Sequence, residues 1–259
     1  MKNKQMKTIA LATLCLATPL QAQAQDEDMG LFNHLGLGLS AGTDGIGIDL
    51  ATPVTEYAGL RAGISFWPSL KVNKTVSIKD NNPLVTDHVD IQGKLNMFDV
   101  KLLADIYPFR NPFHITAGLF YGKDEVIQVT NTSMFIKNPA NYGMLGITIG
   151  QERIATDREG YIHAHAKVNQ LKPYLGIGYG RAVPKNSRVA VAFDLGVKFW
   201  GEPGVYAMTI NDWGDTSYHK FTYEELDERD DKAIRDAVDI ITKLKVFPVL
   251  SVRITGRLF

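Results

Sequence analysis

Hydrophobic residues alternate with small or polar residues along several stretches of this 259-residue chain. In the first stretch, LGLGLSAGTDGIGIDL from Leu35 to Leu50, leucine and isoleucine occupy one face, while mainly glycine, serine and aspartate occupy the other. Thr43-Asp44-Gly45 interrupts the alternation with the residues of a tight turn. Because successive side chains of a strand point to opposite faces, this stretch predicts a β-hairpin with one apolar face.

The same stretch contains Gly36-x-Gly38-x-x-Ala41, which matches the dinucleotide-binding pattern. A dinucleotide loop must be followed by a helix, whose N-terminus holds the pyrophosphate. The residues that follow are GTDGIGIDL, and their glycines, Asp-Gly turn and alternating isoleucines disfavour a helix. We therefore interpret the glycines as strand residues that face a crowded space.

The alternation recurs and predicts eight strands. Their approximate ranges are 34–42, 45–54, 57–67, 93–107, 113–123, 171–181, 188–201 and 246–258. The second, fourth and sixth connections are short, whereas the third, fifth and seventh are long; only the first, TDG, departs from this order. Short turns at one end and long loops at the other are typical of outer-membrane barrels, so we predict an all-β, eight-stranded antiparallel transmembrane β-barrel.

Some segments of the long connections also have strand character. NKTVSIK and DHVDIQG could extend the third and fourth strands beyond the membrane, while DEVIQVT and YGMLGITIG could add a hairpin and make ten strands.

The two faces of the predicted strands indicate which way they point. One face is continuously aliphatic and aromatic, and the other is mainly glycine and alanine with charges of both signs. A soluble sandwich would have a wet face rich in Lys, Glu and Thr, so we expect the apolar face to meet lipid and the small face to fill a narrow interior. The inner charges are the candidate lumen-lining residues, as a static ion-pair plug or as a polar pathway. They are Asp49, Arg61, Asp99, Lys101, Asp105, Lys172, Asp194, Lys198, Arg253 and Arg257.

The N-terminal segment has the composition of a secretory signal. Three lysines precede an apolar run from Ile9 to Leu20, and Ala22-Gln23-Ala24 follows, so we predict a signal peptide over 1–24 and a barrel domain over 25–259. The single cysteine, Cys15, lies within the signal, which leaves no thiol chemistry in the mature chain. Processing removes three of 28 basic residues, so 25 face 28 acidic ones, which gives no electrostatic case for nucleic-acid binding.

The last long connection predicts an amphipathic helix at about 222–245. Thr222-x-x-Glu225 is a capping box. The expected apolar stripe is Leu226, Ala233, Ile234, Ala237, Val238, Ile241 and Leu244. The expected ion pairs are Glu225–Arg229, Glu228–Lys232, Asp231–Arg235 and Asp239–Lys243. We expect the stripe to pack over the barrel mouth or its loops, with a movable lid or a partner-docking helix as the alternative.

Two short motifs contain residue types used in catalysis or metal binding. His163-x-His165 would place two imidazoles on one strand face, but no third ligand is evident, so we interpret it as an ordinary polar strand or loop. Asp215-x-Ser217-x-His219 has the residue types of a hydrolase triad. Side chains two apart on a strand are separated by roughly 7 Å in rise, which does not suit the proton relay of a triad.

Several segments together resemble a known family. LGLGLSAGTDGIGIDL, YAGLRAGISF, KPYLGIGYGRAV, VAFDLGVKFWGEPGV and KVFPVLSVRI occur in this order. They resemble a family of small Gram-negative outer-membrane β-barrels that includes the ornithine-uptake, carbapenem-susceptibility porins, over most of the barrel but not the long loops. The resemblance implies an eight-stranded barrel and, in some members, passage of basic amino acids. It carries over no site residue.

These observations lead to a functional hypothesis with two alternatives. We expect a monomer in outer-membrane lipid, with long loops extracellular and termini periplasmic, and with no cofactor, metal or nucleic acid. The leading hypothesis is a narrow porin-like channel for small polar or basic solutes. The alternative is a non-transporting barrel, structural or adhesive, whose outer loops bind partners, and the remote alternative is a lipid-modifying enzyme.

Overall fold

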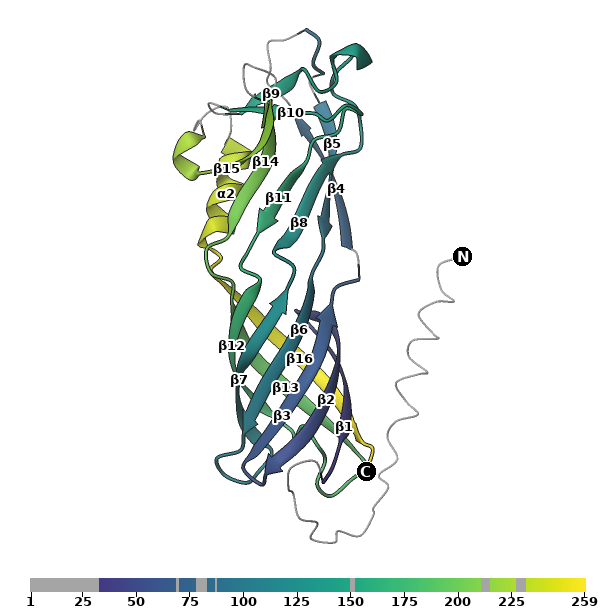
Figure 1. Ribbon diagram of the computed structural model, residues 1–259, viewed down its shortest axis with the longest axis vertical. Coiled ribbons are helices and arrows are strands. Elements are labelled where there is room, and N and C mark those ends of the chain that lie inside the picture. The colour runs from purple at the N-terminus through teal and green to yellow at the C-terminus, as the bar shows by residue number, and fades with distance from the viewer. Residues whose placement is uncertain are drawn as a thin grey trace, which may run out of the picture.

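The computed structural model describes residues 33–68, 70–77, 83–86, 88–149, 152–210, 215–226 and 232–259. The predicted signal peptide lies outside these ranges. Figure 1 shows a barrel at one end of the molecule and a second, open sheet that rises from it at the other.

Eight antiparallel strands close the barrel, in the order β1-β16-β13-β12-β7-β6-β3-β2. Their bounds are β1 Gly36–Gly42, β2 Gly45–Thr55, β3 Ala58–Phe66, β6 Phe98–Ile106, β7 Phe113–Gly122, β12 Leu171–Tyr179, β13 Val189–Phe199 and β16 Val246–Arg257. All eight predicted strands are present. The pairing of β1 with β16 closes the barrel, so each of its strands has a paired neighbour on both sides. The predicted fold class is confirmed, and the barrel has eight strands rather than ten.

The side chains of the barrel alternate as the sequence predicts. On the outer surface, Leu102 and Leu250 remain 58% and 57% exposed, whereas the neighbouring Lys101 and Ser251 are buried. Large apolar side chains are therefore presented to the surroundings while polar ones are enclosed, which is the arrangement of a barrel in lipid. Gly63 shows why the inner face needs small residues, because a Cβ there would collide with the backbone of Ile48 and with Asp49 on β2.

The long connections build a second sheet beyond one end of the barrel. Its order is β4-β5-β8-β11-β14-β10-β9, with β15 paired to β14. The bounds are β4 Leu70–Ser77, β5 His88–Leu95, β8 Glu125–Asn131, β9 Gly146–Ile149, β10 Glu152–Ala155, β11 Ala164–Lys167, β14 Gly204–Ile210 and β15 Thr216–Phe221. We call the barrel end from which this sheet rises the loop end, and the opposite end the turn end (Figure 1).

The β-like segments of the long connections thus form this sheet. NKTVSIK and DHVDIQG supply most of β4 and β5, which pair with each other and lead out of β3 and into β6. DEVIQVT contributes β8, and YGMLGITIG contributes β9. Both lie outside the barrel, so the hairpin that would have made ten barrel strands is absent from its closed order.

Three adjacent barrel strands, β16, β1 and β2, do not pass into the second sheet. β1 pairs with β16 only as far as Gly42, opposite Ser251, although β16 continues to Val246. Thr43 caps the edge of β16 beyond this point, because its amide donates to Leu250 O at 2.9 Å and its hydroxyl to Pro248 O at 2.8 Å. The barrel wall is therefore shorter here, and we call the gap above Thr43, between Trp67 and Phe247, the notch.

The predicted helix is present but shorter than expected. α2 spans Lys232–Lys243, and the capping box starts only the 3₁₀ turn η2, Tyr223–Glu225, because Leu226 is already extended. Glu225 accepts from the amide of Thr222 at 3.3 Å, as a capping box requires. A second 3₁₀ turn, η1, spans Pro139–Asn141.

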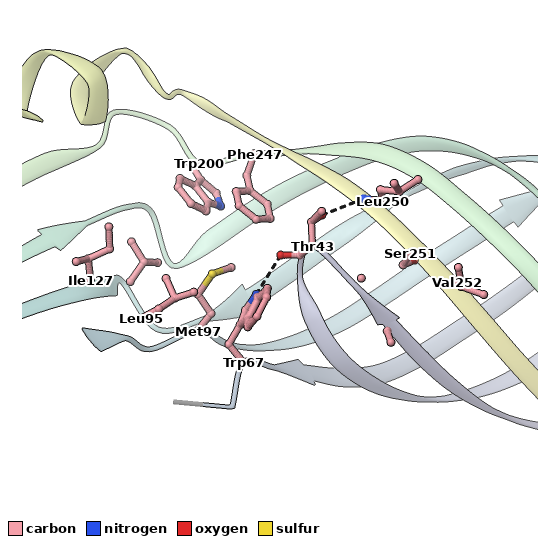
Figure 2. Close-up of a pocket in the computed structure, with 13 residues that line it drawn as sticks. Thr43, Trp67, Leu95, Met97, Ile127, Trp200, Phe247, Leu250, Ser251 and Val252 are labelled. Carbon is pink, nitrogen blue, oxygen red and sulfur yellow. Dashed lines mark hydrogen bonds between the residues drawn. The ribbon is translucent and has the colours of Figure 1, made fainter. Parts of the chain in front are cut away.

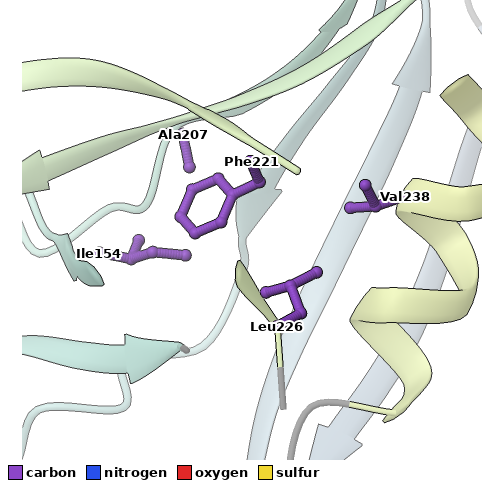
Figure 3. Packing of buried hydrophobic residues seen from close by; sticks show 5 residues of the cluster. All are labelled: Ile154, Ala207, Phe221, Leu226 and Val238. Carbon is purple, nitrogen blue, oxygen red and sulfur yellow. The ribbon is translucent and has the colours of Figure 1, made fainter. Parts of the chain in front are cut away.

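The apolar stripe of the helix packs against the second sheet. Leu226 and Val238 are 4% and 1% exposed and lie with Phe221, Ala207 and Ile154 in one cluster (Figure 3). The stripe is less buried toward its C-terminal end, where Leu244 is 43% exposed. The helix thus covers the sheet that the long loops form, which is the second of the two expected positions, rather than the barrel mouth.

One of the four ion pairs expected on the helix is observed. Asp239–Lys243 forms at 2.8 Å, whereas each of the other three pairs includes a residue outside the described ranges. Among the described residues, no helix is both long enough and apolar enough to cross a membrane.

Candidate functional site

Charged side chains fill the barrel interior. Nine of the ten predicted residues are buried, namely Asp49, Arg61, Asp99, Lys101, Asp105, Lys172, Asp194, Lys198 and Arg253. Arg257 lies apart from them at the turn end, partly exposed, and donates to Lys185 O at 3.3 Å. With the buried Asp44, five carboxylates face five cations inside the barrel, so their formal charges balance.

The cluster nearer the turn end is centred on Arg61. Its guanidinium lies 2.7 Å from Asp105 and 3.2 Å from Asp194. Asp194 also lies 3.0 Å from His114 Nε2 and 3.6 Å from Arg253 Nε. These side chains come from five different strands, so the cluster ties the barrel walls together across the lumen.

The cluster at the loop end is centred on Asp99. Its two carboxylate oxygens accept from Lys172 Nζ at 2.6 Å and from Lys198 Nζ at 3.0 Å. Lys198 also lies 4.3 Å above the centre of the Phe120 ring and 4.0 Å from Asp44. A cation that is held by two carboxylates and a ring face is anchored rather than free to move.

Between the clusters, Asp49 and Lys101 form an ion pair at 2.8 Å. The guanidinium of Arg253 is 1% exposed, and its nitrogens have no hydrogen-bond acceptor among the described residues. A void of about 20 Å³ lies against Arg253, Asp49 and Lys101, and it has room for about one water molecule. A second void of about 10 Å³ lies near Tyr107 and Arg181 at the turn end.

Apolar side chains close the middle of the lumen. The rings of Phe120 and Tyr174 meet edge to face with centroids 5.4 Å apart, and they pack with Leu103 and Val249. Gly196 leaves the room that the Tyr174 ring occupies, since a Cβ there would collide with its hydroxyl. The described interior is therefore packed with side chains, as the small circumference of an eight-stranded barrel requires.

Some members of this network were not among the predicted residues. His114 lies 3.0 Å from Asp194, and the Thr116 hydroxyl donates to Asp105 at 2.7 Å. Both are inward positions of the strand HITAGLFYG, so its period of two was the available signal. Asp44 sits in the β1–β2 turn, where its type suggested only turn formation.

The two short motifs lie in the second sheet. His163 Nε2 is 2.8 Å from Asp157; burial raises the pKa of this carboxyl, but the hydrogen bonds from His163 and from backbone amides outweigh it and lower the pKa overall. His165 stacks on Tyr206 at 5.6 Å, and burial lowers its pKa. Within the described residues, no group of three or more His, Cys, Asp or Glu is placed to hold a metal ion.

Ser217 and His219 lie on β15. The imidazole of His219 lies 3.0 Å from Glu225 and meets the Phe221 ring edge to face. The hydrogen bond from His219 is the main cause that lowers the pKa of Glu225. Ser217 pairs with Thr209 of β14, whose hydroxyl donates to Ser217 O at 3.3 Å. These contacts fasten β15 and η2 to the sheet.

No protein-family model matches the chain, and no curated protein matches it. Among solved structures, the chain is similar to Acinetobacter baumannii CarO, with 19% identity and a TM-score of 0.48 over 88% of this chain and 99% of that one. A. baumannii CarO2 has 20% identity and a TM-score of 0.47 over 86% and 98%. A major outer membrane protein from Thermus thermophilus has 13% identity and a TM-score of 0.36 over 87% and 98%.

Proposed function

We propose that the protein is a Gram-negative outer-membrane barrel that is closed along its axis and acts at its loop end as a membrane-anchored binding surface. In this proposal the second sheet lies outside the cell, and the termini lie on the periplasmic side. The exposed apolar belt supports a membrane location, since seven barrel strands have 9 to 12 residues, about the length that crosses a bilayer.

The packing of the lumen is the observation that carries the proposal. Two voids lined by described residues, of about 20 Å³ and 10 Å³, each have room for about one water molecule, and the Phe120 and Tyr174 rings lie between the charged clusters. A solute as large as an amino acid would have to displace these side chains and break ion pairs that are buried. The closed interior therefore favours the non-transporting alternative over an open pore.

Planar-bilayer conductance of the purified protein tests this proposal. We expect no discrete ion steps from the protein, whereas an open general porin in the same bilayer gives them. Liposome swelling with amino acids and with sugars should likewise match protein-free liposomes. Regular steps that scale with the amount of protein would refute a closed barrel.

A gated channel for small polar or basic solutes is the second candidate. Charges of both signs along the whole interior favour it, because they could accompany a zwitterionic or cationic solute. If a pathway opens, Asp99→Ala and Arg253→Ala should shift ion selectivity in opposite directions, toward anions and toward cations respectively. The same sign of shift from both variants would argue against a charged pathway.

A further inference from the structure

A large apolar cavity lies in the notch, at the loop end of the ion-paired interior (Figure 2). Its volume is about 630 Å³, which is within the usual range of sites for small ligands. Most of its lining is aliphatic or aromatic, and it includes Trp67, Met97, Trp200 and Phe247, which pack together in one hydrophobic cluster. No charged side chain lies among the described residues that line it.

The cavity is continuous with the lipid-facing surface of the barrel. Its lining includes Ala41 of β1 and Leu250 and Val252 of β16, whose side chains belong to the exposed apolar belt. The short β1–β2 hairpin opens the wall at this place, because β16 extends past the last residue of β1. An apolar chain in the membrane can therefore reach the cavity sideways without crossing water.

One polar group in the lining is a buried hydrogen-bond donor that has no acceptor among the described residues. Trp200 is 7% exposed and stacks on Phe247 at 4.7 Å, and its indole N–H has no acceptor among the described residues. The indole of Trp67, across the notch, instead donates to Thr43 O at 3.0 Å. A buried N–H without an acceptor costs free energy, so an oxygen brought in by a ligand would be stabilised at Trp200.

We propose that this cavity binds an acyl chain of an amphiphile, which enters laterally through the notch from the adjacent leaflet. The chain fills the apolar cavity, and an oxygen of the amphiphile accepts from Trp200 Nε1. This site does not rest on the proposed function, because it lies at the barrel wall and is independent of whether the lumen opens.

Tryptophan fluorescence can test the site, because two of the three tryptophans line the cavity. In a Trp213→Phe background in alkyl maltoside micelles, dibromostearic acid should quench the emission of Trp67 and Trp200 with saturation. Excess stearic acid or excess diacyl phosphatidylcholine should restore the emission, and the more effective competitor identifies a free amphiphile or a bilayer lipid as the source. Quenching that rises without saturation, or that neither competitor reverses, would overturn the proposal.

Two variants separate the cavity from general partition into the micelle. Ala41→Phe places a ring at the opening and should weaken dibromostearic acid binding about tenfold, the effect of losing roughly two methylene contacts. Ala62→Phe makes the same change on the outer face of β3, away from the notch, and should leave binding unchanged. Equal effects of the two variants would exclude the notch as the site.

A third variant tests the indole N–H. Trp200→Phe keeps an aromatic ring against Phe247 but removes the donor, with Trp67 left as the reporter. It should weaken binding of dibromostearic acid several-fold more than binding of a dibrominated alkane, which has no oxygen. Equal weakening of both probes would refute the role of Trp200 as a hydrogen-bond donor.

Discussion

The Asp49–Lys101 pair allows the balance of interior charges to be tested with two variants. Both side chains are buried, at 1% and 5% exposure, and they form an ion pair with each other at 2.8 Å. Lys101→Met alone removes the cation in direct contact with the Asp49 carboxylate, and breaking a buried pair in this way costs about 3–5 kcal/mol. Asp49→Leu together with Lys101→Met removes both charges, and such replacements are often neutral or stabilising by about 1–4 kcal/mol.

Urea unfolding of the barrel in phospholipid vesicles, followed by tryptophan fluorescence, measures both effects. The control is Lys243→Met, which breaks the exposed Asp239–Lys243 helix pair and should change the urea midpoint very little, because solvent screens an exposed pair. We expect the single variant to unfold at a lower urea concentration, and the double variant to recover most of the loss. A Lys101→Met variant as stable as the control, or a double variant no more stable than the single one, would refute the reasoning.

Three further predictions concern packing and pH. Leu226→Ala should weaken the attachment of the helix by about 2–5 kcal/mol, seen as faster hydrogen exchange in β14 and β15. Gly63→Val should destabilise the barrel by about 1–3 kcal/mol in the urea assay, because its side chain meets Asp49. His219→Asn should raise the pKa of Glu225 toward its ordinary value, as measured by carboxyl-carbon NMR titration. Because the pKa of Glu225 is lower in the folded state than in the unfolded state, the contact with His219 stabilises the fold fully at a pH above the unfolded-state pKa. This stabilisation is lost as the pH falls through the folded-state pKa. An unchanged pKa of Glu225 in the His219→Asn variant would contradict the prediction.

The barrel could be predicted from the sequence because the pattern that indicates each strand involves only residues that are close together in the chain. A period of two needs only neighbouring residues, and the contrast between its two faces tells whether the apolar one points in or out. The alternation therefore predicts that Leu250 and Arg253 lie on opposite sides of the wall, and the structure places them so.

The remaining features depend on contacts between distant parts of the chain. The partners of Asp194 come from β3, β7 and β16, so these four side chains meet only through the shared register of four strands. The notch arises because β1 stops opposite Ser251 while β16 continues, and neither strand shows this alone. The helix is shorter than its pattern because the chain at Leu226 extends to fill the second sheet's apolar cluster.

The most direct test of the account is the orientation of the two strand faces. Cys15 lies in the predicted signal peptide, so the mature chain can be labelled at single cysteines introduced along β16 from 250 to 255. For the barrel in vesicles, spin labels at Leu250, Val252 and Ile254 should collide readily with dissolved oxygen, and labels at Ser251, Arg253 and Thr255 should be shielded. The opposite phase, or equal accessibility at all six positions, would contradict the lipid-facing barrel.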